Sequence, residues 1–162
     1  MHDAILPSEA APHVCTEIRM LRWSYDAVCL RETDDPLEQV CWLECCLLHC
    51  RNLIEFLDHR TKSDRIRAVD FTAGWRGNDH ADLDKRINTY LTHIGDGRIE
   101  QTIWWVFNVV EPILADLRRF TEALEPATRE LFLAIQPDIR PGAGCTKLEH
   151  ITSVRASPES NS

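Results

Sequence analysis

Apolar side chains recur at intervals of three and four residues along most of this chain, the spacing that gathers them on one face of an α-helix. Four segments show the pattern: 13–31, 36–60, 82–94 and 99–124. A fifth, at 127–135, adds a short helix. No stretch alternates with a period of two residues. The sequence therefore predicts an all-α fold, an up-and-down helical bundle of three long helices plus a short helix at 82–94.

Segment 36–60 is the most apolar of the predicted helices. Its apolar positions step by alternating threes and fours, the seam of a helix bundle. They are Val40, Leu43, Leu47, Cys50, Ile54 and Leu57. Asp35 is placed to cap the amino end of this helix, and Pro36 suits its first position. In segment 99–124, Pro112 removes a backbone hydrogen bond, so we expect a kink there.

The two ends of the chain are predicted to be less regular than its middle. Residues 1–12 contain prolines and few apolar side chains, so we expect a flexible leader before a bundle at 13–136. Residues 137–162 turn to Pro, Gly and Ser, which predicts a disordered tail. The amino end lacks the pattern of a secretion signal, and no apolar run approaches the roughly 20 residues of a membrane span. These observations predict a cytoplasmic protein with no membrane segment.

The net charge of −8 argues against a general nucleic-acid-binding protein. The charge is unevenly distributed, because residues 59–98 hold 8 Lys or Arg against 6 Asp or Glu while the flanking segments are acidic. A mildly basic centre in an acidic protein is compatible with one anion-binding face. It is equally compatible with a random scatter of surface charge.

Four of the seven cysteines, Cys41, Cys45, Cys46 and Cys50, fall within ten residues of one predicted helix. Neighbours on a single helix rarely meet disulfide geometry, so we expect free thiols. Cys41, Cys45 and His49 repeat every four residues, as in a metal-binding stripe. The outer two would lie about 12 Å apart along the axis, whereas zinc holds each ligand within about 2.3 Å. We therefore predict structural cysteines, no metal and no cofactor. The alternative is a metal-binding bundle, in which a pair of these residues binds an ion together with Cys15 or Cys29 of another helix.

Arg86 and His93 form the arrangement best suited to chemistry. They are seven residues apart, two helical turns, so they share one edge of the predicted helix. A guanidinium can hold a phosphodiester while an imidazole, whose ordinary pKa is near neutrality, transfers a proton. In the alternative interpretation, Arg86 pairs with Asp82 and His93 caps the last turn of its own helix.

A second polar patch is expected on the most apolar helix, where His49, Arg51 and Asn52 lie close together. Asn88 is the polar amide nearest to Arg86 in the short helix. These four residues are candidates for substrate binding. The alternative is a solvated or internally paired surface.

Arg86-x6-His93, on a polar helix edge within a small helical bundle, resembles the Arg-x(4–6)-His motif of HEPN domains. Part of the chain also resembles uncharacterised bacterial helical proteins of that group, over Leu47–Ile54, Ala68–Phe71 and Ile87–Ile94. Two features depart from the family pattern. Ile87 follows the arginine where a polar residue is usual, and Ile94-Gly95 replaces the His-x-Tyr ending of toxins that are silenced by nucleotidylation.

The resemblance implies a homodimer with two Arg–His pairs in a shared cleft. It further implies a metal-independent ribonuclease of toxin–antitoxin or antiviral defence, in which Arg86 holds the phosphate and His93 carries the proton. An antitoxin or a nucleotidyltransferase would then be its protein partner. Many HEPN domains are inactive, so the alternative function is a catalytically silent helical module that binds a protein partner.

Overall fold

The computed structural model describes residues 7–60, 66–92 and 106–135, and all regular structure in them is helical. The helices are α1 (Pro7–Leu30), α2 (Pro36–Leu57), α3 (Ala68–Phe71), α4 (Ala81–Thr92), α6 (Val106–Ala123) and α7 (Pro126–Ile135). The all-α prediction is confirmed for this part of the chain. Among the described helices, none combines the length and the hydrophobicity that crossing a membrane requires.

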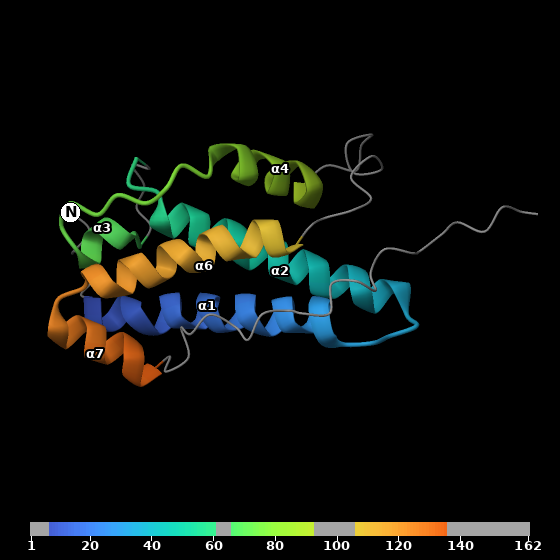
Figure 1. The fold of residues 1–162 in the computed structure, drawn as a ribbon, viewed down its shortest axis with the longest axis horizontal. Coiled ribbons are helices and arrows are strands. Elements are labelled where there is room, and N and C mark those ends of the chain that lie inside the picture. The colour runs from blue at the N-terminus through green and yellow to red at the C-terminus, as the bar shows by residue number, and fades with distance from the viewer. Residues whose placement is uncertain (1–6, 61–65, 93–105, 136–162) are drawn as a thin grey trace, which may run out of the picture.

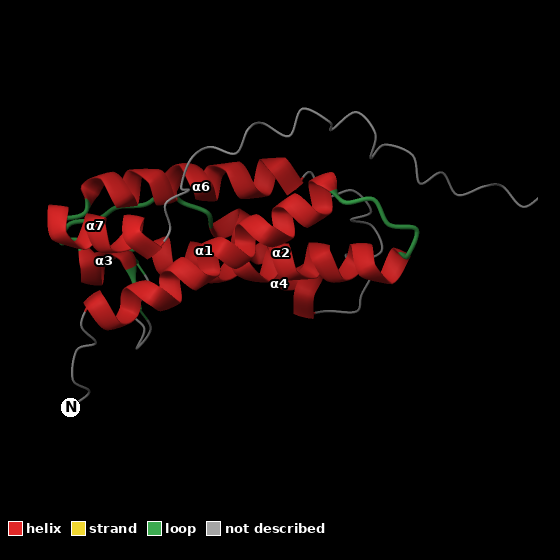
Figure 2. Ribbon diagram, turned by 90° about the horizontal axis from the view of Figure 1, so that it is seen from below, coloured by secondary structure: helices red, strands yellow, loops and turns green. Residues whose placement is uncertain are grey.

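Helix α2 lies at the centre of the arrangement. It runs antiparallel to α1 along the length of the molecule, and it also contacts α3, α4 and α6 (Figure 1). Helix α6 covers one face of the α1–α2 pair, as the perpendicular view shows (Figure 2). Helix α7 packs against α1, and α4 lies along the side of α2. This arrangement places α4 at the edge of the bundle, where one of its faces remains open to solvent.

Helix α1 begins earlier than the sequence pattern predicted. It starts at Pro7, so residues 7–12 belong to the helix and not to a flexible leader. The physical reason is that the apolar face of α1 continues through Ala10 and Ala11, both buried in the core. Residues 1–6 and the predicted tail at 137–162 lie outside the described residues.

Two other predicted helices differ at their ends from the observed ones. The sequence also favours a short helix at 63–69 with Ser63 as its cap, whereas the observed α3 spans Ala68–Phe71. The first part of the predicted helix at 99–124 lies outside the described residues, and α6 is seen from Val106. Helix α6 continues through Pro112 as one element. The sequence correctly predicted the beginning of α2, where the Asp35 carboxylate accepts a hydrogen bond of 2.9 Å from the Leu37 N–H.

The seam predicted for α2 is buried only in its second half. Leu47, Cys50, Ile54 and Leu57 are in the core, whereas Val40 at the amino end is exposed. Leu48, which follows the seam residue Leu47, is exposed as well. Periodicity identified the correct face of the helix, but it could not show how far along α2 the other described helices reach.

Five aromatic side chains join the second half of α2 to the rest of the bundle. Phe120 of α6 lies at their centre and makes edge-to-face contacts with all the others, at ring-centroid distances of 5.1–5.9 Å. Its neighbours are Phe56 of α2, Phe71 of α3, Trp75 of the following segment and Phe132 of α7. Each such pair adds about 0.5–1.5 kcal/mol beyond the burial of its area. Phe120 therefore connects four separate parts of the chain.

The carboxyl end of α6 is closed by a side chain from the next helix. Arg129 of α7 donates hydrogen bonds to the carbonyls of Thr121 (3.1 Å), Leu124 (3.0 Å) and Glu122. The last carbonyls of a helix have no partner within the helix, so an arginine there satisfies them and also complements the helix dipole. This contact fixes the turn between α6 and α7.

Phe120→Ala is expected to lower the free energy of unfolding by about 3–5 kcal/mol, because it removes a fully buried ring and leaves a cavity. Urea unfolding followed by circular dichroism measures the change. Phe107→Ala, at an exposed position of the same helix, is the matched control and should change stability by about 0.5 kcal/mol or less. Equal losses in the two variants would contradict a core centred on Phe120.

Candidate functional site

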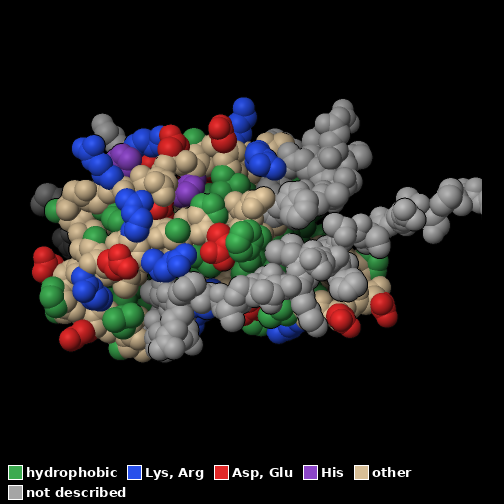
Figure 3. Space-filling model, viewed as in Figure 1, with side chains coloured by type: hydrophobic (Ala, Val, Ile, Leu, Met, Phe, Trp, Pro, Cys, Tyr) green, Lys and Arg blue, Asp and Glu red, His purple; other side chains and the backbone are tan. Residues whose placement is uncertain are grey.

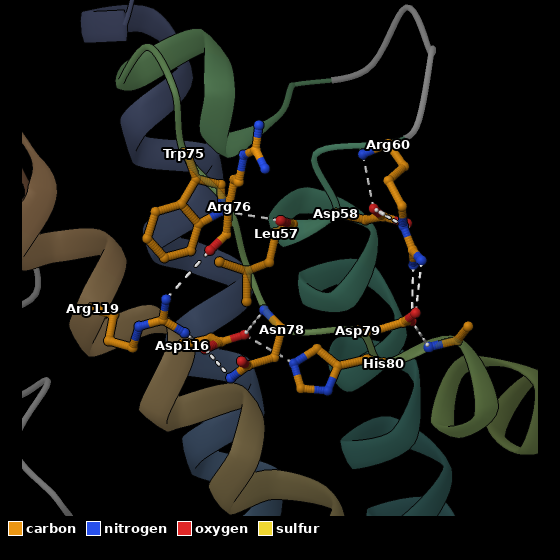
Figure 4. A network of polar contacts seen from close by, with 11 residues as sticks. Leu57, Asp58, Arg60, Trp75, Arg76, Asn78, Asp79, His80, Asp116 and Arg119 are labelled. Atoms are coloured by element: carbon orange, nitrogen blue, oxygen red, sulfur yellow. Dashed lines mark hydrogen bonds and ion pairs between the residues drawn. The ribbon is translucent and has the colours of Figure 1, made fainter.

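The segment that joins α3 to α4 is tied to the end of α2. The indole Nε1 of buried Trp75 donates a hydrogen bond of 3.0 Å to the Leu57 carbonyl (Figure 4). Gly77 lies so close to the same carbonyl that a Cβ added to Gly77 would be 2.9 Å from the carbonyl oxygen. Only glycine fits there without a backbone shift. Gly74, with a φ of +80°, forms the turn that precedes this contact.

Asp116 of α6 is the acceptor that holds the next part of this segment. Its side chain is fully buried, and each carboxylate oxygen accepts two hydrogen bonds. Oδ1 accepts from Asn78 Nδ2 (2.6 Å) and from Arg119 (2.8 Å). Oδ2 accepts from the Asn78 backbone N–H (2.8 Å) and lies 3.0 Å from His80 Nε2. Figure 4 shows these donors converging on the single carboxylate.

The surroundings of Asp116 determine which nitrogen of His80 carries the proton. Asn78 and Arg119 present only N–H donors to the carboxylate, so Asp116 is an ionised acceptor and the fourth contact, His80 Nε2, is also a donor. In the neutral ring, Nδ1 then has a free lone pair. Within the described part of the chain, Nδ1 has no hydrogen-bond partner.

The His80 ring lines a hollow of about 300 Å³ between α2, the segment 78–80 and α4. Its lining is mainly polar and contains acids, cations and amides. The acids are Glu55, Asp58 and Asp84; the cations are Arg51 and Arg60; the amides are Asn78 and Asn88. A hollow with this lining can hold a small polar molecule by several hydrogen bonds.

Arg60 closes one side of the hollow by bridging two carboxylates. Its guanidinium binds Asp79 through two hydrogen bonds of 2.8 and 2.9 Å and binds Asp58 at 3.0 Å. Asp79 also accepts a hydrogen bond from the Ala81 N–H at the first residue of α4. The guanidinium, followed by this N–H, holds the pKa of Asp79 below its usual range. Arg60 and Asp79 together connect the end of α2 to the beginning of α4.

The surroundings of Asp84, one of the carboxylates that line the hollow, disfavour its charge. Burial raises its pKa, and the nearby Glu55 and Asp58 carboxylates raise it further. Arg51 and a hydrogen bond of 3.0 Å from Asn88 oppose this shift without cancelling it. Burial, more than the balance of charges in the hollow, therefore disfavours the ionised form of Asp84.

The structure brings together some of the predicted site residues. Arg51 of α2 and Asn88 of α4 line the same hollow. Arg86 lies on α4 and is exposed, and it is not among the residues that line the hollow. His93 follows the last residue of α4 and lies outside the described residues. The predicted pairing of Arg86 with His93 thus stays a prediction.

His49 and Asn52, the other two predicted binding residues, face α1. Both contact one carboxylate oxygen of Glu17: His49 Nδ1 lies 2.7 Å from it, and Asn52 Nδ2 donates to it at 3.0 Å. Arg51 lies on a different side of α2, toward the hollow. The polar patch expected on this helix is therefore divided between two surfaces, and its members do not form one site.

Sequence reasoning missed His80 and Asp116. In the sequence, residues 70–80 show only the glycines and aromatic side chains of an irregular segment, and Asp116 lies inside the predicted helix at 99–124. One signal was available: Asp116 falls between the apolar positions Leu114 and Leu117, where an acid needs buried donors. The sequence could not show that the donors come from a segment 36 and 38 residues away.

The six described cysteines form no disulfide, as predicted. Burial raises the pKa of the Cys15 thiol to about 11 and also raises the pKa of Cys50, so both stay protonated at neutral pH. Such thiols are weak nucleophiles and weak metal ligands. Within the described ranges, no group of three His, Cys, Asp or Glu side chains could hold a metal ion.

Comparison with known proteins adds no assignment. No protein-family model matches the sequence, and neither curated proteins nor solved structures provide a match. The function therefore has to be argued from the side chains and their arrangement.

Asp84→Asn is expected to increase stability at neutral pH. The pKa of Asp84 in the folded protein is raised above the unfolded value of about 3.9, so the folded state keeps this proton to higher pH. The contribution of this bound proton to the free energy of unfolding is complete below about pH 4. It is lost as the pH rises through the pKa that Asp84 has in the folded protein. Asparagine keeps the acceptor for Asn88 but carries no charge. The gain in unfolding free energy, measured with urea, should therefore be larger at pH 7 than at pH 4.

Asp82→Asn is the matched control, because Asp82 lies in the same first turn of α4 but is exposed and outside the hollow. The Asp82→Asn variant loses the same favourable negative charge near the amino end of the helix. Its free energy of unfolding should therefore equal that of the wild type or be slightly lower. If Asp84→Asn lost as much stability at pH 7 as Asp82→Asn, the prediction would be wrong, because the hollow would then not destabilise the Asp84 carboxylate.

Proposed function

We propose that the protein binds single-stranded RNA along the exposed edge of α4 and cleaves it there through Arg86 and His93. The observation that carries this proposal is the orientation of α4. Ile87 and Tyr90 are buried against the bundle, and this anchoring leaves Lys85 and Arg86 exposed. An exposed guanidinium on a helix held from behind is suited to bind a phosphate group.

Phosphate contacts are assigned to this outer edge and not to the hollow. The hollow carries three carboxylates against two guanidinium groups, and one of these, Arg60, is already held by Asp58 and Asp79. An RNA backbone would be repelled there. Over α4 the surface presents Lys and Arg side chains interspersed with acids (Figure 3), so a few local phosphate contacts fit better than a long electropositive track.

The resemblance to HEPN domains supplies the proposed mechanism. Arg86 would neutralise the scissile phosphate while the 2′-oxygen bonds to phosphorus and the bond from phosphorus to the 5′-oxygen breaks. His93, which directly follows α4 in sequence, would take the proton of the 2′-hydroxyl, and the departing 5′-oxygen would receive a proton in turn. No metal ion takes part in this proposal. A homodimer would bring two such edges together, and an antitoxin would regulate them.

A second candidate function, binding of a protein partner without catalysis, is favoured by the turn between α1 and α2. Leu30 and Leu37 are 62% and 69% exposed there. The same turn presents four exposed or half-exposed acids, Glu32, Asp34, Asp35 and Glu38. Apolar side chains within an acidic surface fit a basic amphipathic segment of another protein. This candidate needs neither Arg86 nor His93.

The ribonuclease proposal predicts that the purified full chain cleaves a labelled single-stranded RNA in EDTA. Arg86→Ala and His93→Ala should each lower the rate at least about 100-fold, because each removes one of the two groups that act on the phosphate. Arg86→Ala should also weaken RNA binding and reduce the slope of log affinity against log salt by about 0.7, the loss of one phosphate contact.

Arg19→Ala, at an exposed cation of α1, is the control and should leave cleavage and the salt slope unchanged. Wild-type protein that binds RNA but does not cut it in EDTA would reduce the proposal to binding. Wild-type protein that does not bind RNA at low salt would overturn it in favour of the protein-partner candidate.

A further inference from the structure

We infer that the first half of α2 is a docking surface for a basic amphipathic helix of another protein. The inference rests on the second candidate function and specifies it, because it names the face that binds and the chemistry of the bound segment. It involves neither Arg86 nor His93, so it is independent of RNA cleavage. Three features support it: a row of exposed side chains on α2, the helix that covers the rest of that row, and the charges beside it.

One face of α2 carries a row of side chains spaced alternately four and three residues apart, as neighbours on one side of a helix are. The row consists of Leu37, Cys41, Glu44, Leu48, Arg51 and Glu55. In its first half, Leu37 is 69% and Leu48 43% exposed, and Cys41 between them is exposed as well. Val40, on the adjacent side of the helix, is 38% exposed. Apolar side chains grouped in this way are typical of a surface that binds another molecule.

The second half of the same row shows what kind of element this face accepts. Arg51 and Glu55 line the hollow together with Asp84 and Asn88, so α4 lies over this half of the row. Helix α4 runs back along α2 toward the amino end of α2 and stops at Thr92 (Figure 1). The exposed apolar side chains lie on the part of α2 nearer to that amino end. A second helix placed in line with α4 would therefore extend a contact that the fold already makes.

The charges beside the exposed half of the row favour a basic partner. Residues 32–48 contain five acids and neither Lys nor Arg. Four of these acids form no ion pair with a described residue: Glu32, Asp34, Asp35 and Glu38. The hydrogen bonds that Asp35 and Glu38 accept, from the Leu37 N–H and the Thr33 hydroxyl, leave their negative charges in place. Arg31, the cation just before this stretch, packs over the rings of Trp23 and Trp42.

A helix with leucines at every third or fourth position and Lys or Arg on both flanks matches these features. Its apolar face would cover Leu37, Val40 and Leu48, and its cations would reach the acids at the start of α2. A second copy of this surface fits less well, because residues 32–48 offer no cation to the acids of the other copy. RNA phosphates would be repelled by the same acids.

A synthetic helical peptide of about 18 residues, with leucines on one face and lysines on its flanks, is the probe. The control peptide has glutamates in place of the lysines. Binding to the full-length protein is measured by fluorescence anisotropy in about 0.15 M salt, which screens weak surface attraction. Alkylation of Cys41 by iodoacetamide, followed by mass spectrometry, reports whether the peptide covers the row.

The lysine peptide is expected to bind, and the glutamate peptide is not. At a lysine-peptide concentration about ten times the Kd, alkylation of Cys41 should slow about tenfold, because only the free protein reacts. Leu48→Ser should weaken binding about tenfold or more, because it removes an apolar contact of the row. Leu133→Ser is the matched control, because Leu133 of α7 is 42% exposed on another helix, and it should leave the affinity unchanged.

Binding of the lysine peptide without protection of Cys41, or equal weakening in the two leucine variants, would overturn the inference. The second candidate function would then stand, with its contact on another surface. Equal binding of the glutamate peptide, or no binding of either peptide, would also overturn the inference. Self-association of the protein in sedimentation experiments that Leu48→Ser abolishes would assign the row to a second copy instead.

Discussion

The buried carboxylate of Asp116 is the interaction on which the polar side of this bundle depends. Removing an ionised carboxylate from water costs several kcal/mol unless hydrogen bonds replace its hydration. Here four N–H donors do so, from Asn78, His80 and Arg119, two on each oxygen. Because three of these donors belong to residues 78–80, the charge in α6 determines the path of a segment that has no regular structure of its own.

Three hydrogen-bonded contacts made by residues 75–80 determine where α4 begins. The Trp75 indole holds the Leu57 carbonyl, Asp116 holds Asn78 and His80, and Arg60 holds Asp79. Helix α4 starts immediately after the last of these contacts. Its orientation, with one face on α2 and the opposite edge in solvent, therefore follows from contacts made before the helix starts. The hollow and the exposed cations of α4 are two consequences of the same set of contacts.

Much of the fold could be predicted from the sequence because it depends on local spacing. The buried positions of α2 from Leu47 to Leu57 follow the predicted period, and Asp35 caps the helix as its position indicated. The beginning of α1 could not be predicted in this way. Alanines carry a weak hydrophobic signal, and Ala10 and Ala11 became core residues only because other helices cover them.

The candidate site was less predictable, because it depends on contacts between distant segments. Arg51 and Asn88 were selected from the sequence and do meet at the hollow. His49 and Asn52 were assigned to the same patch, but they lie on the side of α2 that faces Glu17, about 100° or more around the helix from Arg51. Asp116 and His80 lie in separate segments, and nothing in the spacing of either one indicates the other.

The protonation of the His80 ring tests this account most directly, because Asp116 can orient the ring only by accepting its Nε2 proton. Long-range ¹H–¹⁵N correlation spectra of the full-length protein distinguish the two neutral tautomers. The account predicts a protonated Nε2 and an unprotonated Nδ1 in the neutral ring. A neutral ring protonated at Nδ1 would mean that Asp116 does not orient His80.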